Sequence, residues 1–185
     1  MRVRVAHAAL NPGGLYFVSV IPASARARTC VPEVECAGVV EETWTPPEQS
    51  TTITEEARVE AEAEFAPGDR VAVLLPTPVS AAGVGALATH VVVPAALAAR
   101  VPDAVSSRDA AALLLTGLTA KRMVADAGVA PREGGCKVLI VGASGGVGTM
   151  AVQLARRAAG PGGRIVAVCS GGNADLVRRL GADEV

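Results

Sequence analysis

A glycine-rich segment, Gly142–Gly148 (GASGGVG), most constrains what this chain of 185 residues can fold into. It follows a continuous apolar run at Val138–Val141, which is typical of a strand buried on both faces of a parallel sheet. After it, apolar residues recur at helical spacing over Val147–Ala158, and polar residues take the opposite face. The sequence therefore predicts a strand, a tight turn and a helix in that order.

A loop of this kind is suited to a pyrophosphate group. The helix N-terminus carries unpaired N–H groups and a partial positive charge, and pyrophosphate is an anion. We expect a Cβ at Gly145 or Gly146 to block the approach of the group or to forbid the required φ. We expect Gly148 to let the helix lie close to the sheet. The candidate cofactor contacts of this loop are Ser144, Gly145, Gly146, Val147 and Gly148.

The spacing of the glycines separates two nucleotide-binding motifs. Ala143 stands where the usual dinucleotide fingerprint has its first Gly, so the match reads Ala143-x-Gly145-x-x-Gly148. A second apolar strand at the expected distance, Arg164–Cys169, favours dinucleotide binding over a purely structural glycine turn. A P-loop would end in Gly-Lys-Ser/Thr, whereas this loop ends in Gly-Thr, so we set the P-loop aside.

The tip of the second strand bears on the choice between NADP and NAD. NAD sites place an Asp or Glu about 20 residues after the glycine loop, on the ribose hydroxyls. The segment Cys169–Asn173 offers no acid there. Ser170 and Asn173 can donate hydrogen bonds to a phosphate, which favours NADP(H) over NAD(H). The alternative for both residues is helix capping, which needs no ligand.

Composition excludes several partners. Half of the residues are hydrophobic, the net charge is -1 and aromatic residues make up 2%, which argues against disorder and against nucleic-acid binding. The uncharged stretch Val71–Ala99 is long enough to span a bilayer, but three prolines and a β-type run at Val91–Val93 favour buried strands. We expect a small-molecule substrate and no nucleic-acid or membrane partner.

The four cysteines are scattered, and only two histidines could join them around a metal. This pattern favours free thiols in a reducing compartment and no structural zinc. The first 32 residues contain four Arg and no acid, which is a weak feature of transit peptides. We expect a cytoplasmic protein, with a mitochondrial location as the alternative.

The pattern changes from strand type to helix type near residue 106, where Ser106-x-x-Asp109 fits a helix-start capping box. The sequence therefore predicts two domains, residues 1–105 and 106–185. In the first of these, Asn11–Gly14 (NPGG) predicts a turn that breaks any helix there.

An acidic stretch interrupts the first domain. Residues 33–69 hold ten Glu, one Asp and one Arg. We interpret the stretch as a solvated surface segment, with an acidic insertion at about residues 43–66.

Six blocks occur in the order of a known family. They are Leu10–Pro12, Gly38–Val40, Pro67–Val71, Leu118–Ala120, Gly142–Gly148 and Leu180–Val185. Together they make the chain resemble the medium-chain dehydrogenase/reductase superfamily, in its zinc-free quinone-oxidoreductase-like (enoyl-reductase-type) branch. The resemblance implies an α/β protein. A GroES-like, β-rich catalytic part precedes an incomplete Rossmann part with a parallel sheet, and the active site lies between them.

The resemblance also implies a reaction and its residues. In similar proteins NADPH delivers a hydride to a quinone, an enone or a related activated carbonyl or alkene, without zinc. An Asn and a Tyr five residues later lie beside the nicotinamide, and Asn11 and Tyr16 match them. Gly14 takes the place of an Asp often found between them. Val34 stands where zinc-using relatives have a His.

Two threonines fall in a segment that passes near the nicotinamide in similar enzymes. They are Thr116 and Thr119, and Thr119 is the candidate cofactor contact. The alternative is that both hydroxyls bond to their own helical turn.

Two other functions stay open: a truncated, non-catalytic dinucleotide-binding remnant, or an enoyl-reductase module of a polyketide-type system. Members of the family continue through further Rossmann strands. We therefore expect this polypeptide to be a fragment or truncated product that is unstable or inactive alone. At full length we expect a homodimer.

Overall fold

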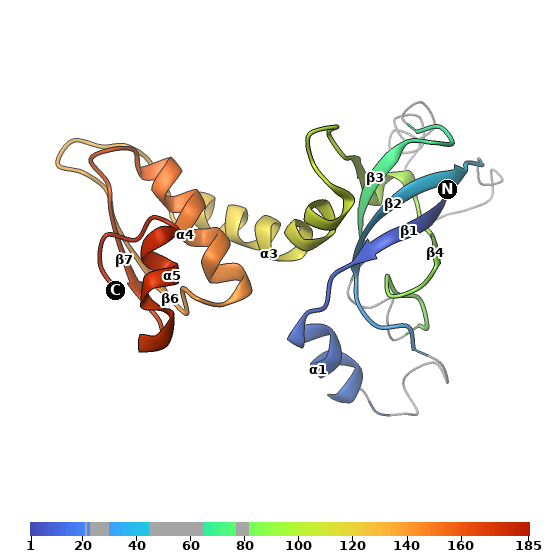
Figure 1. The fold of residues 1–185 in the computed structure, drawn as a ribbon, viewed down its shortest axis with the longest axis horizontal. Helices are drawn as coiled ribbons and strands as arrows, with labels where there is room; N and C mark the ends of the chain where they lie inside the picture. Colours follow the sequence, from blue (N-terminus) through green and yellow to red (C-terminus); the bar gives the residue numbers. More distant parts are fainter. Residues whose placement is uncertain (21, 23–29, 45–64, 77–81) are drawn as a thin grey trace. The chain divides into compact units, whose positions relative to one another are not determined.

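The computed structural model describes residues 1–20, 22, 30–44, 65–76 and 82–185 (Figure 1). They divide into two compact units, Met1–Leu114 and Leu115–Val185. The predicted fold class is confirmed, because an antiparallel sheet is followed by an α/β segment with a parallel sheet. The domain boundary at 105/106 stays a prediction. Most of the predicted acidic insertion lies outside the described residues.

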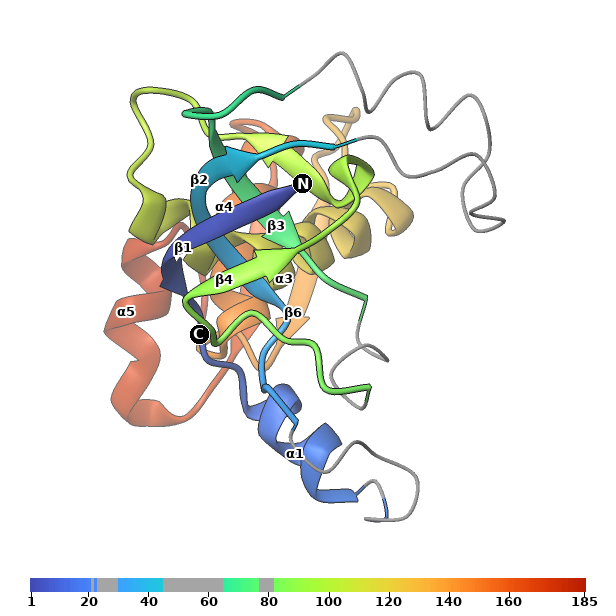
Figure 2. The ribbon, with the colours of Figure 1, turned by 90° about the vertical axis from the view of Figure 1, so that its right-hand side faces the viewer.

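The first unit is built on a five-stranded sheet in the order β4-β1-β2-β3-β5, with every neighbouring pair antiparallel (Figure 2). Its elements are β1 (Arg2–Ala8), β2 (Glu35–Glu42), β3 (Arg70–Leu74), β4 (His90–Val92), the short 3-10 helix η3 (Ala95–Leu97) and β5 (Ala98–Arg100). Gly38 lies where β1 and β2 approach each other, since an added Cβ would sit 2.1 Å from the Arg4 carbonyl oxygen. Close packing of β1 on β2 therefore explains the glycine of the Gly38–Val40 block.

The core of this sheet consists of alternating strand residues. Val3, Val71 and Val73 are fully buried, and Val40 is 1% exposed. Burying each such side chain contributes roughly 1.5–3 kcal/mol. The described part of the Val71–Ala99 stretch supplies β3, β4 and β5, as its prolines and Val run predicted. Within the described ranges, no helix combines the length and apolarity needed to cross a bilayer.

The Asn11–Gly14 segment starts a helix, so the prediction of a helix-breaking turn is wrong. Helix α1 spans Pro12–Val20. Proline fits the first helical position because its φ suits a helix and its missing N–H would have no partner there. The Gly14 N–H donates to the Asn11 carbonyl at 3.0 Å, which closes the first turn.

Helix α3 (Ser107–Asp126) begins at the predicted capping box. Ser106 Oγ accepts the Asp109 N–H at 3.1 Å and donates to Asp109 Oδ2 at 2.7 Å. The helix ends where Gly128 takes a φ of +62°, a conformation that favours glycine after a helix. The predicted start of this helix is confirmed.

The second unit contains β6 (Lys137–Val141), α4 (Gly146–Ala159), β7 (Arg164–Val168), the 3-10 helix η4 (Gly171–Asn173) and α5 (Ala174–Arg179). β6 and β7 are parallel, in register from Lys137↔Arg164 to Val141↔Val168. Glu184 forms a parallel bridge with Val166, so a third segment of the chain pairs with β7 there.

A side-chain anchor holds this third segment. Asp183 Oδ2 accepts the Ile165 N–H at 2.6 Å and pairs with the Arg156 guanidinium. Arg156 also donates to the Gly181 and Gly163 carbonyls at 3.2 and 3.0 Å. These bonds tie the end of the chain to α4 and β7.

Only one face of the parallel sheet is covered in the described part of the chain. Ile165 and Val152 pack with Ala143, Ala155 and Val177 in the core. On the other face Leu139 is 64% exposed and Val141 is 74% exposed. The expectation of a strand buried on both faces is therefore wrong for the described residues.

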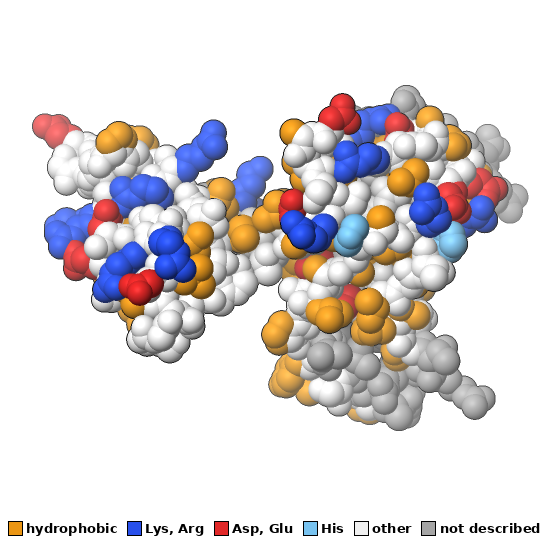
Figure 3. All heavy atoms as spheres, viewed as in Figure 1, with side chains coloured by type: hydrophobic (Ala, Val, Ile, Leu, Met, Phe, Trp, Pro, Cys, Tyr) orange, Lys and Arg blue, Asp and Glu red, His pale blue; other side chains and the backbone are white. Residues whose placement is uncertain are grey.

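Charged side chains of both signs are intermingled on the face of the molecule in Figure 3. In the first unit Glu41 Oε1 lies 3.1 Å from Arg4 Nε, and Glu41 Oε2 lies 3.2 Å from His90 Nε2. Exposed pairs of this kind contribute about 0–1 kcal/mol each.

Candidate functional site

The glycine loop joins β6 to α4 and is held by backbone hydrogen bonds. Gly142 has a φ of +73°, in the left-handed region that favours glycine. Its N–H and the N–H of Ala143 both donate to the Val168 carbonyl at 3.0 Å. The Gly145 N–H donates to the Gly142 carbonyl at 3.0 Å, which closes the turn. The loop is thereby fixed to the end of the neighbouring strand.

Gly148 is the most constrained glycine of the loop. A Cβ there would lie 2.2 Å from the Gly142 carbonyl oxygen and 2.8 Å from backbone atoms of Ala143. Both neighbours are main-chain atoms that cannot rotate away. Gly148 therefore lets the helix begin against the backbone of the loop.

Gly145 and Gly146 are less constrained than expected. Gly145 has a φ of −78°, and an added Cβ would be 3.4 Å from its nearest neighbour. Gly146 also lacks a positive φ, and its nearest neighbour would be Thr116 Cγ2 at 3.1 Å. The expectation that φ requires glycine at these two positions is wrong. The conformational requirement falls on Gly142, which the sequence analysis did not single out.

The N-terminus of α4 is open to an anion. Gly145 occupies the cap position and no side chain caps the helix. The first turn contains no acid, while Arg156 and Arg157 lie in the last turn. The first N–H groups of a helix have no partner inside the helix, and the helix dipole places partial positive charge there. This arrangement can hold a phosphate group.

Three predicted residues from separate segments lie together at the carboxyl ends of β6 and β7. Asn173 Nδ2 donates to Ser144 Oγ at 3.2 Å and to Ser170 Oγ at 3.0 Å. Neither Ser170 nor Asn173 makes a side-chain capping bond to its helix. Of the two roles left open for these residues, side-chain capping is therefore not observed. Because Asn173 Nδ2 gives both of its hydrogens to these bonds, the two serine hydroxyls are the groups left to donate to phosphate oxygens.

The two threonines of α3 behave differently. Thr119 Oγ1 donates to the Leu115 carbonyl at 2.6 Å, which is the bond within its own turn that the sequence analysis held as the alternative. The methyl group of Thr116 lies close to Gly146, since a Cβ added at Gly146 would be 3.1 Å from Thr116 Cγ2. A cofactor contact by Thr119 stays a prediction.

Asn11 and Tyr16 have different surroundings in the first unit, since Asn11 is half-buried and Tyr16 is exposed. Asn11 donates its N–H to Glu33 Oε2 at 3.1 Å and its Nδ2 to Glu35 Oε1 at 2.7 Å. Tyr16, on α1, is 69% exposed. Asn11 is thus held by two carboxylates, whereas Tyr16 faces outward. Their role beside a nicotinamide stays a prediction.

Glu33 and Glu35 are site residues that the sequence analysis missed. Each is 1% exposed, so the interpretation of residues 33–69 as a solvated segment is wrong for them. The apolar residues between and after them, Val34 and Cys36, were the available signal of a buried strand. Burial and the charge of Glu35 raise the pKa of the Cys36 thiol to about 11, so this thiol is not a nucleophile at neutral pH.

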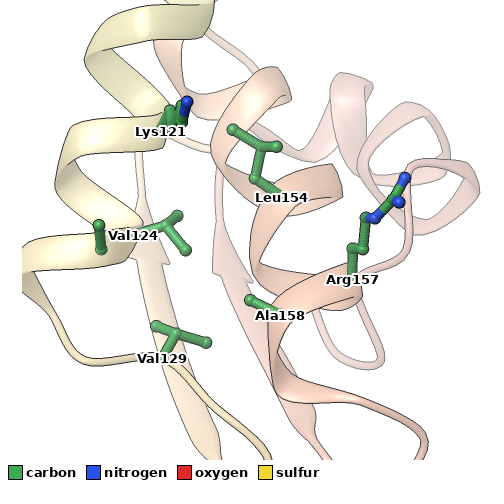
Figure 4. A pocket seen from close by; sticks show the side chains of 7 residues that line it. Lys121, Val124, Val129, Leu154, Arg157 and Ala158 are labelled. Carbon is green, nitrogen blue, oxygen red and sulfur yellow. The ribbon is translucent and has the colours of Figure 1, made fainter.

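A pocket of about 490 Å³ lies between α3 and α4 (Figure 4). Its lining is mostly apolar, with two cationic side chains: Lys121, Val124, Ala125, Val129, Leu154, Arg157 and Ala158. It adjoins the C-terminal half of α4, where the helix dipole disfavours anions. It is therefore separate from the glycine loop. Over the described ranges, no three or more His, Cys, Asp or Glu side chains form a group that could hold a metal ion.

Comparisons with known proteins point to one family, although no protein-family model matches the chain. It is 38% identical over 124 residues to the chloroplast envelope quinone oxidoreductase homolog of Arabidopsis thaliana, covering 65% of this chain and 36% of the relative. It is 37% identical over 123 residues to the mitochondrial NAD(P)H oxidoreductase RTN4IP1 of Mus musculus, covering 29% of the relative. It is 41% identical over 120 residues to erythronolide synthase EryA2 of Saccharopolyspora erythraea, covering 3% of it.

Solved structures extend the similarity to the whole chain. The quinone oxidoreductase of Pseudomonas syringae pv. Tomato DC3000 matches with a TM-score of 0.74 at 30% identity, over 99% of this chain and 48% of that one. The quinone oxidoreductase of Thermus thermophilus, solved alone and with NADPH, matches with a TM-score of 0.69 at 29% identity, again over 99% and 48%. The chain spans about half the length of these structures and about a third of the Arabidopsis relative.

Proposed function

Because the chain belongs to the quinone-oxidoreductase-like branch of the medium-chain dehydrogenase/reductase superfamily, we propose that it serves NADPH-dependent hydride transfer to a quinone, an enone or a related activated carbonyl or alkene. The proposal includes a small-molecule substrate, no zinc and, at full length, a homodimer. It also includes a cytoplasmic location, with a mitochondrial one as the alternative.

The uncapped N-terminus of α4 carries this proposal. The residues present fit a dinucleotide, because Gly148 brings the helix start against the loop and no side chain makes a capping hydrogen bond to its N–H groups. Gly146, Val147 and Gly148 would donate these N–H groups to the pyrophosphate. When bound, the cofactor supplies the hydride, and the protein binds and orients it.

Ser144, Ser170 and Asn173 support a preference for NADP(H). The tip of β7 carries no acid that would repel a 2′-phosphate. The hydrogen bonds that Asn173 makes to both serines fix the three side chains near one another. In this arrangement the two serine hydroxyls are the donors offered to a phosphate at this edge of the sheet, and Asn173 orients them.

Titration with NADPH and NADH tests the proposal. The wild-type chain is expected to bind NADPH about tenfold more tightly than NADH, since hydrogen bonds to a charged phosphate are the stronger kind. Ser170→Asp places a carboxylate at the tip of β7 and is expected to weaken NADPH binding and to reduce or reverse the preference. Ser170→Ala is the matched control without charge. If neither NADPH nor NADH binds the wild-type chain, the proposal is contradicted.

A second function is favoured by the similarity to erythronolide synthase EryA2, which is as high in identity as that to the quinone oxidoreductases. In an enoyl-reductase module the same loop would bind NADPH, and the acceptor would be an α,β-unsaturated thioester. NADPH oxidation by the full-length protein with a 1,4-quinone, compared with an enoyl thioester, separates the two functions. Binding without turnover on either acceptor would indicate a non-catalytic dinucleotide-binding remnant.

A further inference from the structure

The pocket between α3 and α4 lies wholly within the second unit, since its lining residues run from Lys121 to Ala158. Val124 and Val129 also pack against the buried core of this unit, which holds that side of the pocket in place. The volume of about 490 Å³ falls within the range of small-molecule sites, about 300–1,000 Å³. The pocket is therefore large enough for an organic ligand.

The two ends of the pocket differ in chemistry. Lys121 of α3 and Leu154 of α4 lie at one end, and Val129 and Ala158 lie at the other (Figure 4). Arg157 extends from α4 away from α3 in the same view. Lys121 is thus the cation beside the apolar lining, and Arg157 stands at its outer border.

Both cations lack a counter-ion. Lys121 and Arg157 have no hydrogen-bond or ion-pair partner in the part of the chain that the structure describes. By contrast Arg122, next to Lys121 in sequence, pairs with Asp126 at 2.7 Å. No acid is present among the lining residues or anywhere in α4. The pocket therefore combines an apolar surface with uncompensated positive charge, which is complementary to an anion that carries an apolar group.

The helix dipoles determine which end suits the anion. The partial negative charge at a helix C-terminus falls off within the last turn. α3 ends at Asp126 and α4 ends at Ala159, so the end of the pocket at Val129 disfavours an anion. Lys121 stands before the last turn of α3. An anionic group is therefore favoured at the Lys121 end, and an apolar group at the other.

We propose that this pocket binds an amphiphilic anion, namely a carboxylate that carries a hydrocarbon chain of medium length. Lys121 pairs with the carboxylate. The chain lies against Val124, Leu154 and Ala158. Arg157 adds to the positive potential from the outer border. The site is separate from the glycine loop, and the inference does not rest on the proposed hydride transfer.

NMR titration of the 185-residue chain with decanoate, below the concentration at which it forms micelles, locates the site. Saturable shifts of the methyl signals of Val124, Val129 and Leu154 are expected. A competing apolar surface exists on the exposed face of β6, at Leu139 and Val141. Shifts confined to that face, or shifts that do not saturate, overturn the proposal.

The ligand itself can be varied in two ways. Decanoate is expected to bind about four- to fifteenfold more tightly than octanoate, since each fully buried methylene group is worth about fourfold. Decyltrimethylammonium has the same chain and the opposite charge, and it is expected to bind at least about fivefold more weakly than decanoate. Equal binding of the two decyl compounds overturns the role of positive charge.

Two leucine substitutions on α4 test the apolar part of the site. Ala158→Leu places a larger side chain in the pocket and is expected to weaken decanoate binding at least about tenfold, because the chain and the new side chain compete for one space. Gln153→Leu adds the same side chain at an exposed position outside the pocket and should keep the wild-type affinity. Unchanged affinity in Ala158→Leu overturns the proposal. If Ala158→Leu does not fold, as judged by thermal unfolding, the methyl shifts of the wild-type chain still decide.

Three charge substitutions test the carboxylate contact. Lys121→Gln is expected to weaken decanoate binding about three- to fivefold, the value of an exposed ion pair. Arg157→Gln should weaken it less. Arg179→Gln removes the same charge from an exposed position outside the pocket and should have no effect. Equal affinities in Lys121→Gln and Arg179→Gln overturn the contact. Decanoate binding needs no dinucleotide, so failure of NADPH to bind contradicts the proposed function alone.

Discussion

The glycine loop of the second unit differs in construction from a cluster in the first unit, the Asn11 cluster, which consists of Asn11, Glu33 and Glu35. The loop is made of main chain, and its critical contact is between Gly148 and the Gly142 carbonyl. The cluster is made of buried side chains, and its critical contact is between Gly14 and the Glu33 carboxylate. A main-chain site tolerates almost no added atom, whereas a side chain can move aside. Gly→Ala substitutions at positions 148 and 14 therefore measure how much less an added methyl group costs beside a side chain than beside the main chain.

The largest effect is expected for Gly148→Ala. Its Cβ would lie 2.2 Å from a main-chain oxygen, so α4 must shift away from the loop. We expect a loss of about 2–3 kcal/mol in the free energy of unfolding, in the upper range for overpacking, together with loss of NADPH binding. Thermal and urea unfolding measure the first, and titration the second.

Gly145→Ala is the matched control for that substitution. Its φ of −78° and nearest contact of 3.4 Å allow a Cβ, so the free energy of unfolding should change by less than about 1 kcal/mol. NADPH binding should still weaken, because the methyl group stands where the pyrophosphate approaches. Equal destabilisation by both substitutions would show that the loop has another conformation.

Gly14→Ala is expected to cost less than Gly148→Ala. The colliding atoms are the tip of the Glu33 side chain, and alanine gains about 0.8–1 kcal/mol over glycine in a helix. The net change should lie within about 1 kcal/mol of zero. Gly13→Ala has no contact to offset the helix gain and should stabilise the protein by up to that amount. A loss from Gly14→Ala as large as from Gly148→Ala would show that Glu33 cannot move.

Asp183 provides a side-chain anchor inside the second unit. Asp183→Ala removes the acceptor of the Ile165 N–H and the partner of Arg156. We expect a loss of about 1–2 kcal/mol in the free energy of unfolding. Asp183→Asn keeps an acceptor oxygen and should lose less. If both variants unfold like the wild type, the third strand segment is held by its backbone bonds alone.

The same contrast decides what the sequence could predict. The glycine loop, the strands on either side and the capping box at Ser106 follow from local rules about φ, period and helix ends, and they were found. Ser144, Ser170 and Asn173 were predicted separately as cofactor contacts, but only the fold shows that Asn173 is bonded to both serines. Gly142 was missed because the fingerprint drew attention to the later glycines.

Glu33 and Glu35 could not be found in this way, because burial of a carboxylate depends on residues far along the chain. In the sequence they begin an acidic stretch whose other members, such as Glu41 and Glu42, pair with surface arginines. Glu33 is buried because its backbone is bonded to the segment at Ala86 and its side chain to Asn11. A local charge count treats all these residues alike.

Substitution of Asp69 is expected to change the stability least. Asp69 is a surface carboxylate, in contrast to the buried Glu33 and Glu35. A hydrogen bond from Arg100, and then the Ala66 N–H, hold the pKa of Asp69 below its ordinary value of 3.8. A lowered folded-state pKa gives stability that is present above about pH 3.8 and lost as the pH falls through the folded-state value. Asp69→Asn should therefore flatten the acid side of the stability profile and change little near pH 7, where exposed pairs contribute little. If Asp69→Asn leaves the loss of stability at low pH unchanged, other carboxyl groups cause that loss. Asp109 is one such group, because the Ser106 hydroxyl and then Arg108 lower its pKa.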